Sequence, residues 1–238
     1  MRVGLFVTCL VDQVAPDTGR SALRLLEAAG CTVEFPEGQT CCGQPGFNAG
    51  FPDDARRLAR HFMTVFEGYE AIVAPSGSCA AMVRRYYPTL FDGEARDRVE
   101  AVSAKTWELT QFLVEVLGRP DLGIRVEATV TYHASCHLLR ELGVRDAPRQ
   151  LLDDAGVTVV EMVDAERCCG FGGGFSVAHP EISVPMADEK LDRAVASGAH
   201  QLAACDTGCL VHLATRARRR GVDLEARHVA DVLAEGLP

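Results

Sequence analysis

The sequence predicts an α/β fold made of two pseudo-symmetric halves, each with βαβ units around a parallel, Rossmann-like sheet. Short apolar runs alternate with stretches of helical period along the chain. The tripeptide Cys-Cys-Gly occurs twice, at residues 41–43 and 168–170. The segment 151–159 also matches 25–33 in its apolar pattern. Agreement of both patterns indicates an internal duplication. We therefore expect an N-terminal half, residues 1–122, and a C-terminal half, residues 123–238, joined near 119–123.

The first half reads as strands and helices in alternation. The run 2–8 is continuously apolar, as in a buried parallel strand. A helix over 21–29 ends at Gly30, and Pro52 begins the next helix. The remaining expected elements are a strand at 32–35, a loop at 36–45, a strand at 71–74 and a helix over 94–117 that carries Trp107.

The second half repeats this order. We expect a strand over 128–133, a helix over 182–196 and a strand over 201–204, followed by another helix. Strands that alternate with helices in this way form parallel sheets with helical crossovers.

Composition restricts the classes of function. The chain has 238 residues, a net charge of −9 and a pI near 5.3, which argues against nucleic acid or an anionic membrane as the partner. No apolar run reaches the roughly 20 residues that span a bilayer, and we interpret residues 3–11 as a strand rather than a signal peptide. A cytoplasmic protein follows, in which thiols stay reduced and patterned cysteines favour metal or redox chemistry.

Eight of the ten cysteines form two quartets. Cys9 and Cys136 each stand 32 residues before the first cysteine of a pair, and Cys79 and Cys209 follow those pairs by 37 and 40 residues. The predicted metal ligands are Cys9, Cys41, Cys42, Cys79, Cys136, Cys168, Cys169 and Cys209. The first and last cysteines of each quartet, Cys9, Cys79, Cys136 and Cys209, each follow a predicted strand. Loops at the carboxyl ends of parallel strands meet at one edge of the sheet, so each quartet is expected to gather there.

Four thiolates suit either Zn²⁺ or an iron–sulfur cluster. Neighbouring side chains of an extended chain point to opposite faces, so both members of a pair can reach one metal only if the backbone turns. The glycine after each pair permits that turn.

Several segments resemble the duplicated cysteine-rich CCG domain family: Cys9, the 41–45 loop, Pro75-Ser76-Gly77-Ser78-Cys79, Cys136, the 168–173 loop and Asp206-Thr207-Gly208-Cys209. This family includes the cysteine-rich CCG subunit of heterodisulfide reductase and the iron–sulfur subunit of glycolate oxidase. Over nearly the whole chain the sequence is most similar to the lactate utilisation protein A group. The resemblance implies an iron–sulfur electron-transfer subunit of a cytosolic complex that oxidises L-lactate to pyruvate, working beside a ferredoxin-like iron–sulfur subunit and a third subunit.

The sequence departs from the heterodisulfide reductase pattern, in which each half ends in Cys-x-x-Cys and five cysteines bind a non-cubane cluster. Ser76 stands where the first half would have its extra cysteine, and Cys205 precedes Cys209 with three residues between. The resemblance therefore implies a 4Fe–4S cluster at the second site (Cys136, Cys168, Cys169 and Cys209, with Cys205 as a further candidate) and iron–sulfur or zinc at the first.

Three functions stay open from the sequence: an electron-transfer subunit, a thiol or disulfide reductase that uses Cys205, and a zinc-stapled assembly protein without a redox role. His133 and His137 flank Cys136 in the sequence. Three roles stay open for them: metal ligand, hydrogen-bond donor to cluster sulfur, or ordinary residue at a strand end. Cys31, whose repeat partner is Val157, is read as a buried thiol without a ligand role.

Overall fold

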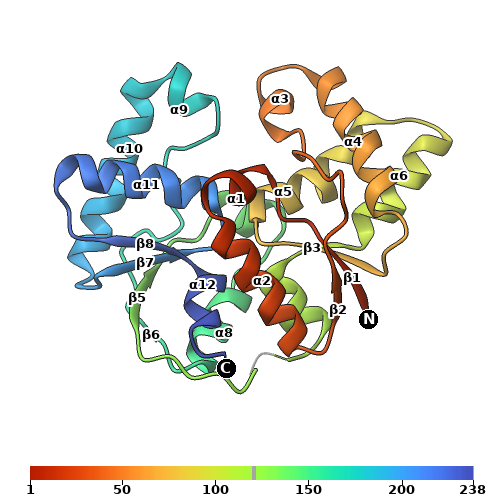
Figure 1. The fold of residues 1–238 in the computed structure, drawn as a ribbon. Coiled ribbons are helices and arrows are strands. Elements are labelled where there is room, and N and C mark those ends of the chain that lie inside the picture. Colours follow the sequence, from red (N-terminus) through yellow and green to blue (C-terminus); the bar gives the residue numbers. More distant parts are fainter. Residues whose placement is uncertain (120–121, 238) are drawn as a thin grey trace.

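The computed structural model describes residues 1–119 and 122–237, and the chain forms two α/β halves that lie side by side (Figure 1). The expected junction at 119–123 includes Pro120 and Asp121, which lie outside the described residues. The two halves have the same strand order, in agreement with the duplication seen in the sequence.

Each half contains a four-stranded sheet in which every described pairing is parallel. The first sheet has the order β2-β1-β3-β4 and the second β6-β5-β7-β8. The strands are β1 (Arg2–Leu5), β2 (Thr32–Glu34), β3 (Ala71–Ala74), β4 (Thr106–Glu108), β5 (Thr129–Tyr132), β6 (Thr158–Val159), β7 (Gln201–Ala204) and β8 (Glu225–His228). After its second strand the chain crosses to the far side of the first strand, so the switch point lies between β1 and β3, and between β5 and β7. Ligands of open α/β sheets bind at the carboxyl ends of strands at such a point.

Helices connect the strands and cover both sheets. In the first half they are α1 (Cys9–Val14), α2 (Pro16–Ala28), α3 (Gln44–Asn48), α4 (Pro52–Phe66), α5 (Gly77–Ala81), η1 (Met82–Tyr86), η2 (Tyr87–Leu90), α6 (Glu94–Ala104), α7 (Leu109–Gln111) and η3 (Phe112–Val116). In the second half they are η4 (His137–Glu141), α8 (Ala147–Asp154), α9 (Phe175–Ala178), α10 (Pro180–Ala196), α11 (Thr207–Arg220) and α12 (Val229–Ala234). Proline at the first position of α2, α4 and α10 suits a helix start, where its missing N–H removes no hydrogen bond.

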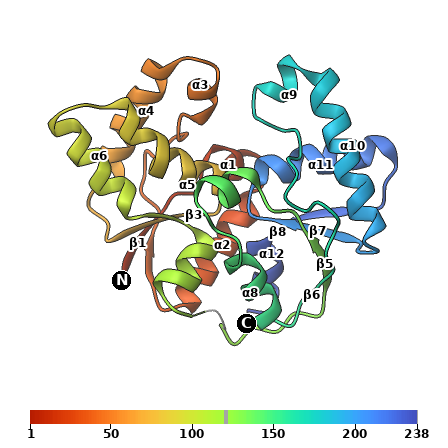
Figure 2. The same cartoon turned by 180° about the vertical axis from the view of Figure 1, so that it is seen from behind.

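One hydrophobic core joins the two halves. Buried residues of β1 and α2 belong to the same apolar cluster as residues of β5, α8 and α12. Both views show α2, α8 and α12 together, on the side of the molecule away from α3 and α9 (Figures 1 and 2). The hydroxyl of Thr18 also donates to Asp231 across the halves at 2.7 Å. None of the helices in the described part of the chain is long and apolar enough to cross a bilayer.

The expectation of one helix over 94–117 is wrong. Helix α6 ends at Ala104, and β4 follows and pairs in parallel with β3 through Ile72 and Thr106. Because β4 has only three residues between two helical stretches, its apolar pattern does not show a strand period. Trp107 lies in β4, half-buried against the shared core, with the guanidinium of Arg84 4.2 Å from its ring centroid.

Candidate metal centres

The first quartet gathers at the carboxyl ends of β1, β2 and β3. Cys9 begins α1 directly after β1, and Cys41 and Cys42 lie in the loop after β2. Cys79 lies in α5, which follows β3. The Cys9 and Cys41 sulfurs are 3.5 Å apart, and the Cys42 and Cys79 sulfurs are 3.4 Å apart. The four sulfurs therefore gather at the switch point of the first sheet.

The second quartet is built in the same way from β5, β6 and β7. Cys136 precedes η4, the Cys168–Cys169 pair lies in the loop after β6, and Cys209 lies in α11. The Cys136 thiol interacts with Cys168, and the Cys169 thiol interacts with both Cys168 and Cys209. Among the described residues, the donor atoms of Cys169, Cys209 and His133 lie within 4.8 Å of one another, a spacing that could hold a metal ion.

The glycine of each Cys-Cys-Gly loop makes the turn possible. Gly43 and Gly170 have φ values of 84° and 89°, which L side chains rarely adopt. In each loop the glycine N–H donates to the sulfur of the first cysteine at 3.4 Å, Gly43 to Cys41 and Gly170 to Cys168. This bond folds the loop back on itself, so both cysteines of a pair reach the same quartet.

The helix that carries the last cysteine of each quartet is capped by a polar residue three positions earlier. The Ser76 hydroxyl accepts a hydrogen bond from the Cys79 N–H at 3.3 Å. The Asp206 carboxylate accepts from the Gly208 N–H at 3.1 Å. Such N-caps fix the first turn of the helix and thereby the position of the cysteine.

Asp206 also links the two halves, a role that the sequence alone does not predict. Its second carboxylate oxygen accepts from the Ser78 N–H at 2.9 Å and from the Ser76 hydroxyl at 3.4 Å. Nearby, the Gly77 N–H donates to the Cys205 carbonyl at 3.1 Å, and a Cβ on Gly77 would lie 2.7 Å from Leu138 Cβ. The Asp-x-x-Cys and Ser-x-x-Cys spacing signals the caps, but only the packing of the halves brings Asp206 to Ser78.

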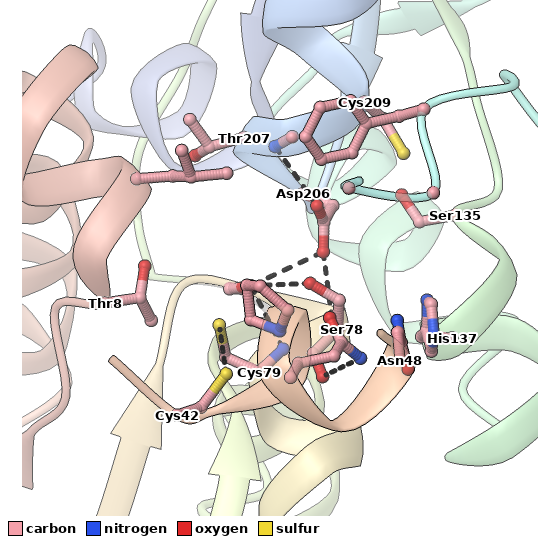
Figure 3. A pocket seen from close by; sticks show the side chains of 18 of the residues that line it. Thr8, Cys42, Asn48, Ser78, Cys79, Ser135, His137, Asp206, Thr207 and Cys209 are labelled. Carbon is pink, nitrogen blue, oxygen red and sulfur yellow. Dashed lines mark hydrogen bonds between the residues drawn. The ribbon is translucent and has the colours of Figure 1, made fainter. Parts of the chain in front are cut away.

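Both quartets border one cavity of about 440 Å³. Its lining includes all eight patterned cysteines together with small polar residues from both halves. Figure 3 shows Cys42 and Cys79 facing each other on one side and Cys209 on the other, with Asp206 between them. The duplicated fold thus places two sulfur-rich sites at a common opening.

The thiols of each quartet have unequal proton affinities. Hydrogen bonds from Cys42 and Cys9 lower the pKa of Cys41 to about 3, and hydrogen bonds from Cys136 and Cys169 lower the pKa of Cys168 to about 2. The same contacts, together with burial, raise the pKa values of their partners Cys9 and Cys136. Each quartet therefore has at least one ready thiolate beside a protonated thiol, and a bound cation would displace the remaining protons.

Cys209 is the other thiol with a low pKa. Its contact with the Cys169 thiol is the main cause that lowers the pKa to about 6, and the imidazole of His133 adds to this against the effect of burial. Deprotonated sulfur is the form that binds metal.

The two remaining cysteines lie elsewhere. Cys205 is fully buried at the end of β7, in the shared core, and its sulfur is 3.8 Å from the Tyr132 hydroxyl. Cys31 packs partly buried against the same core. Neither lines the cavity in the part of the chain that the structure describes. His137 does line it, and its imidazole lies 3.7 Å from the Glu141 carboxylate.

Comparison with known proteins places these features in a family. The cysteine-rich CCG domain matches twice, over residues 3–84 and 130–214. Lactate utilization protein A of Exiguobacterium sp. is 47% identical over 240 residues, covering 99% of this chain and 98% of that protein. The chain belongs to the lactate utilization protein A family, a group of duplicated CCG-domain proteins.

Further members of the lactate utilization protein A family are similar over their full length. For lactate utilization protein A of Anoxybacillus flavithermus the identity is 48%, and the alignment covers 98% of this chain and 99% of that protein. For lactate utilization protein A 2 of Bacillus cereus the identity is 43%, and the alignment covers 100% of this chain and 99% of that protein. Among solved structures, a putative Asp/Glu racemase from Yersinia pestis matches 98% of this chain and 95% of its own at 10% identity, with a TM-score of 0.37.

Proposed function

We propose that this chain is the iron–sulfur electron-transfer subunit of a cytoplasmic complex that oxidises L-lactate to pyruvate. The observation that carries the proposal is the gathering of eight thiols into two quartets at one cavity. Membership of the lactate utilization protein A family supports lactate as the substrate of the whole complex. Its partners would be a ferredoxin-like iron–sulfur subunit and a third subunit.

The proposed ligands of the first centre are Cys9, Cys41, Cys42 and Cys79, and those of the second are Cys136, Cys168, Cys169 and Cys209. A single tetrahedral Zn²⁺ with bonds of about 2.3 Å would hold all four sulfurs about 3.8 Å apart. In the first quartet the separations of 3.5 Å (Cys9–Cys41) and 3.4 Å (Cys42–Cys79) are close to this value, so zinc stays a candidate there. The thiol-only quartets of a duplicated CCG domain support metal centres held by sulfur, which we assign as 4Fe–4S at the second site and as iron–sulfur or zinc at the first.

The lining of the cavity supports electron transfer rather than chemistry on lactate at this site. Among the described lining residues there is no lysine or arginine, whereas a hydroxy acid carboxylate is best held by a cationic side chain. The Asp206 carboxylate already accepts backbone hydrogen bonds from Ser78 and Gly208. A 4Fe–4S cluster, when bound, supplies a one-electron carrier whose potential the protein tunes. Lactate would then be oxidised on another subunit.

Reversible reduction tests the electron-transfer role. Protein purified without oxygen and reconstituted with iron and sulfide should take up electrons from a low-potential reductant, show a cluster EPR signal and return to its starting spectrum on oxidation. In a host that needs this gene for growth on L-lactate, a chain carrying Cys168→Ser should not support growth. A chain carrying Cys31→Ser, the control, should support it. Stoichiometric zinc with neither iron nor sulfide would instead establish the zinc-stapled alternative.

The shared cavity also favours a second candidate, a thiol or disulfide reductase whose substrate lies between the two centres. In the version suggested by the sequence, Cys205 is a fifth ligand, but its sulfur lies in the core beside Tyr132. Replacement of Cys205 by serine should therefore leave the iron content unchanged. Loss of iron or of disulfide-reducing turnover in Cys205→Ser would instead support the reductase in which Cys205 is a ligand.

A further inference from the structure

Two residues beside the second quartet differ in kind from their counterparts beside the first. His133 follows β5 as Phe6 follows β1. The Phe6 N–H donates to the Val73 carbonyl at 2.9 Å, and the His133 N–H donates to the Ala203 carbonyl at 2.8 Å. In each sheet the acceptor belongs to the neighbouring strand at the switch point. Phe6 and His133 therefore hold equivalent positions in the two halves.

The second difference lies on the helices after the Cys-Cys-Gly loops. Helices α4 and α10 both begin at a proline, and their buried residues stand at the same positions, the fourth, eighth, eleventh, twelfth and fifteenth. The eleventh residue is Phe62 in α4 and Lys190 in α10. Lys190 is 1% exposed, so a cation occupies a core position that is aromatic in the first half.

The first centre has an apolar surrounding at these positions. The rings of Phe6 and Phe62 touch edge to face, with centroids 5.0 Å apart, and both belong to the same core cluster as Cys42 and Cys79. Three residues after the last cysteine, the first half has the fully buried Met82. None of these three side chains donates a strong hydrogen bond or carries charge.

His133 brings a donor to the second centre. It is fully buried, and neither ring nitrogen has a hydrogen-bond partner among the described residues. A ring nitrogen lies within 4.8 Å of both the Cys169 and the Cys209 sulfurs. Every protonation state of imidazole carries at least one N–H. Since a buried unpaired N–H is costly, the sulfurs at the second centre are its natural acceptors.

Lys190 brings positive charge to the same place. Its ammonium group donates to the carbonyls of Asp164 at 2.9 Å and Ala165 at 3.1 Å, just before the second Cys-Cys-Gly loop. It also interacts electrostatically with Cys169 and Cys136. His212, at the position that Met82 holds in the first half, adds a partly buried imidazole near Cys168.

Hydrogen bonds to cluster sulfurs and nearby positive charge stabilise the more negative, reduced state of an iron–sulfur centre, and so raise its reduction potential. We propose that His133 and Lys190 make the second centre the electron-accepting one of the two, receiving one electron as an iron–sulfur cluster at the first centre loses one. This inference rests on the proposed electron-transfer function with the iron–sulfur alternative at the first centre. It assigns a direction to electron flow inside a chain whose two halves otherwise look alike.

The test is a potentiometric titration of the full chain, reconstituted with iron and sulfide without oxygen and followed by EPR. A Cys41→Ser background disables the first quartet, so that the second centre is titrated alone. In this background, His133→Phe and Lys190→Met, which remove the donor and the charge, should each shift the midpoint potential downward. Lys190→Arg, which keeps the charge, should stay close to the starting value, and His133→Asn, which keeps an N–H donor, should fall between.

Phe6→Leu is the matched control in the first half and should leave the potential of the second centre unchanged. An unchanged potential in both His133→Phe and Lys190→Met, at full iron and sulfide content, would overturn the inference while leaving the electron-transfer role intact. A chain that holds no iron–sulfur cluster after reconstitution would instead remove the proposed function itself. Where Lys190→Met does not fold, the His133 variants alone decide the outcome.

Discussion

At the scale of single residues, the ten cysteines separate by what surrounds their sulfurs. The regular spacing of eight thiols was enough to group them, because each group follows strand ends that a parallel sheet brings together. The spacing could not show which sulfurs touch, such as Cys9 with Cys41. It also left Cys205 undecided, because only the packing shows its sulfur beside Tyr132 rather than at the cavity.

Metal binding should release protons and weaken at low pH. The pKa of Cys9 and of Cys136 is raised by their thiolate neighbours and by burial, so both thiols are protonated at neutral pH and must lose their protons to bind metal. Calorimetric titration of the reduced, metal-free protein with Zn²⁺ in two buffers of different ionisation enthalpy measures the protons released. We expect net release at pH 7.5 and weaker binding at pH 6. Identical heats in both buffers would contradict this assignment.

At the scale of elements, the Cys-Cys-Gly loops and the short helices after the strands position the ligands. The duplicated tripeptide predicted the turns, and both glycines indeed have positive φ values. The short strands β4 and β8 were not predicted, because β4 stands between two helical stretches and β8, Glu-Ala-Arg-His, lacks the continuous apolar run of the other strands.

Gly170→Ala should disrupt the second loop more than Gly173→Ala does. Both glycines have positive φ, which costs an alanine about 1–2 kcal/mol. A Cβ at Gly170 would also lie 2.6 Å from the Ser183 carbonyl oxygen, whereas at Gly173 nothing lies within 4 Å. In urea denaturation, the free energy of unfolding of Gly170→Ala should be lower than that of Gly173→Ala by about 1–3 kcal/mol. Gly170→Ala should also lose metal from the second centre. Equal stability of the two variants would refute this role of Gly170.

Glu108→Gln should change how stability depends on pH. The Glu108 carboxylate caps α7 by accepting from the Thr110 and Gln111 N–H groups, at 2.8 and 3.1 Å, and burial raises its pKa from 4.5 to about 7. Between these pH values the folded chain keeps a proton that the unfolded chain has lost, so stability falls as pH rises through this window.

A glutamine at position 108 stays neutral and its amide oxygen can accept the same bonds. The variant should therefore match the natural chain at pH 4 and exceed it by about 1–3 kcal/mol at pH 7.5, measured by urea denaturation at both pH values. The same difference at both pH values would show that ionisation of Glu108 has no part in stability.

At the scale of the whole molecule, the two halves act as one folding unit around a shared core. The sequence predicted the duplication and the division into halves, but it gave no sign that α12 of the second half packs on α2 of the first. Nor did it show that Asp206 reaches across to Ser78, because such contacts depend on how two finished sheets pack. The same limit applies to His133 and Lys190, whose importance appears only when the two halves are compared position by position.

Asp206→Ala should weaken this unit. The substitution leaves the buried N–H of Gly208 and the partly buried N–H of Ser78 without their acceptor, at a cost of about 1–3 kcal/mol for a buried group left unpaired. Urea denaturation should show a lower midpoint with a single transition, because the shared core unfolds together. Two separate transitions in the natural chain would show instead that the halves unfold independently.

The most direct test of the two-centre account is the iron, acid-labile sulfide and zinc content of the chain purified without oxygen, measured beside Cys41→Ser, Cys168→Ser and the control Cys31→Ser. We expect about four iron and four sulfide at the second centre, lost in Cys168→Ser but retained in Cys41→Ser and Cys31→Ser. The metal of the first centre, iron or zinc, should be lost in Cys41→Ser alone. A chain without iron, sulfide or zinc after reconstitution, or variants that all keep the full content, would contradict the claim that each quartet holds a metal centre.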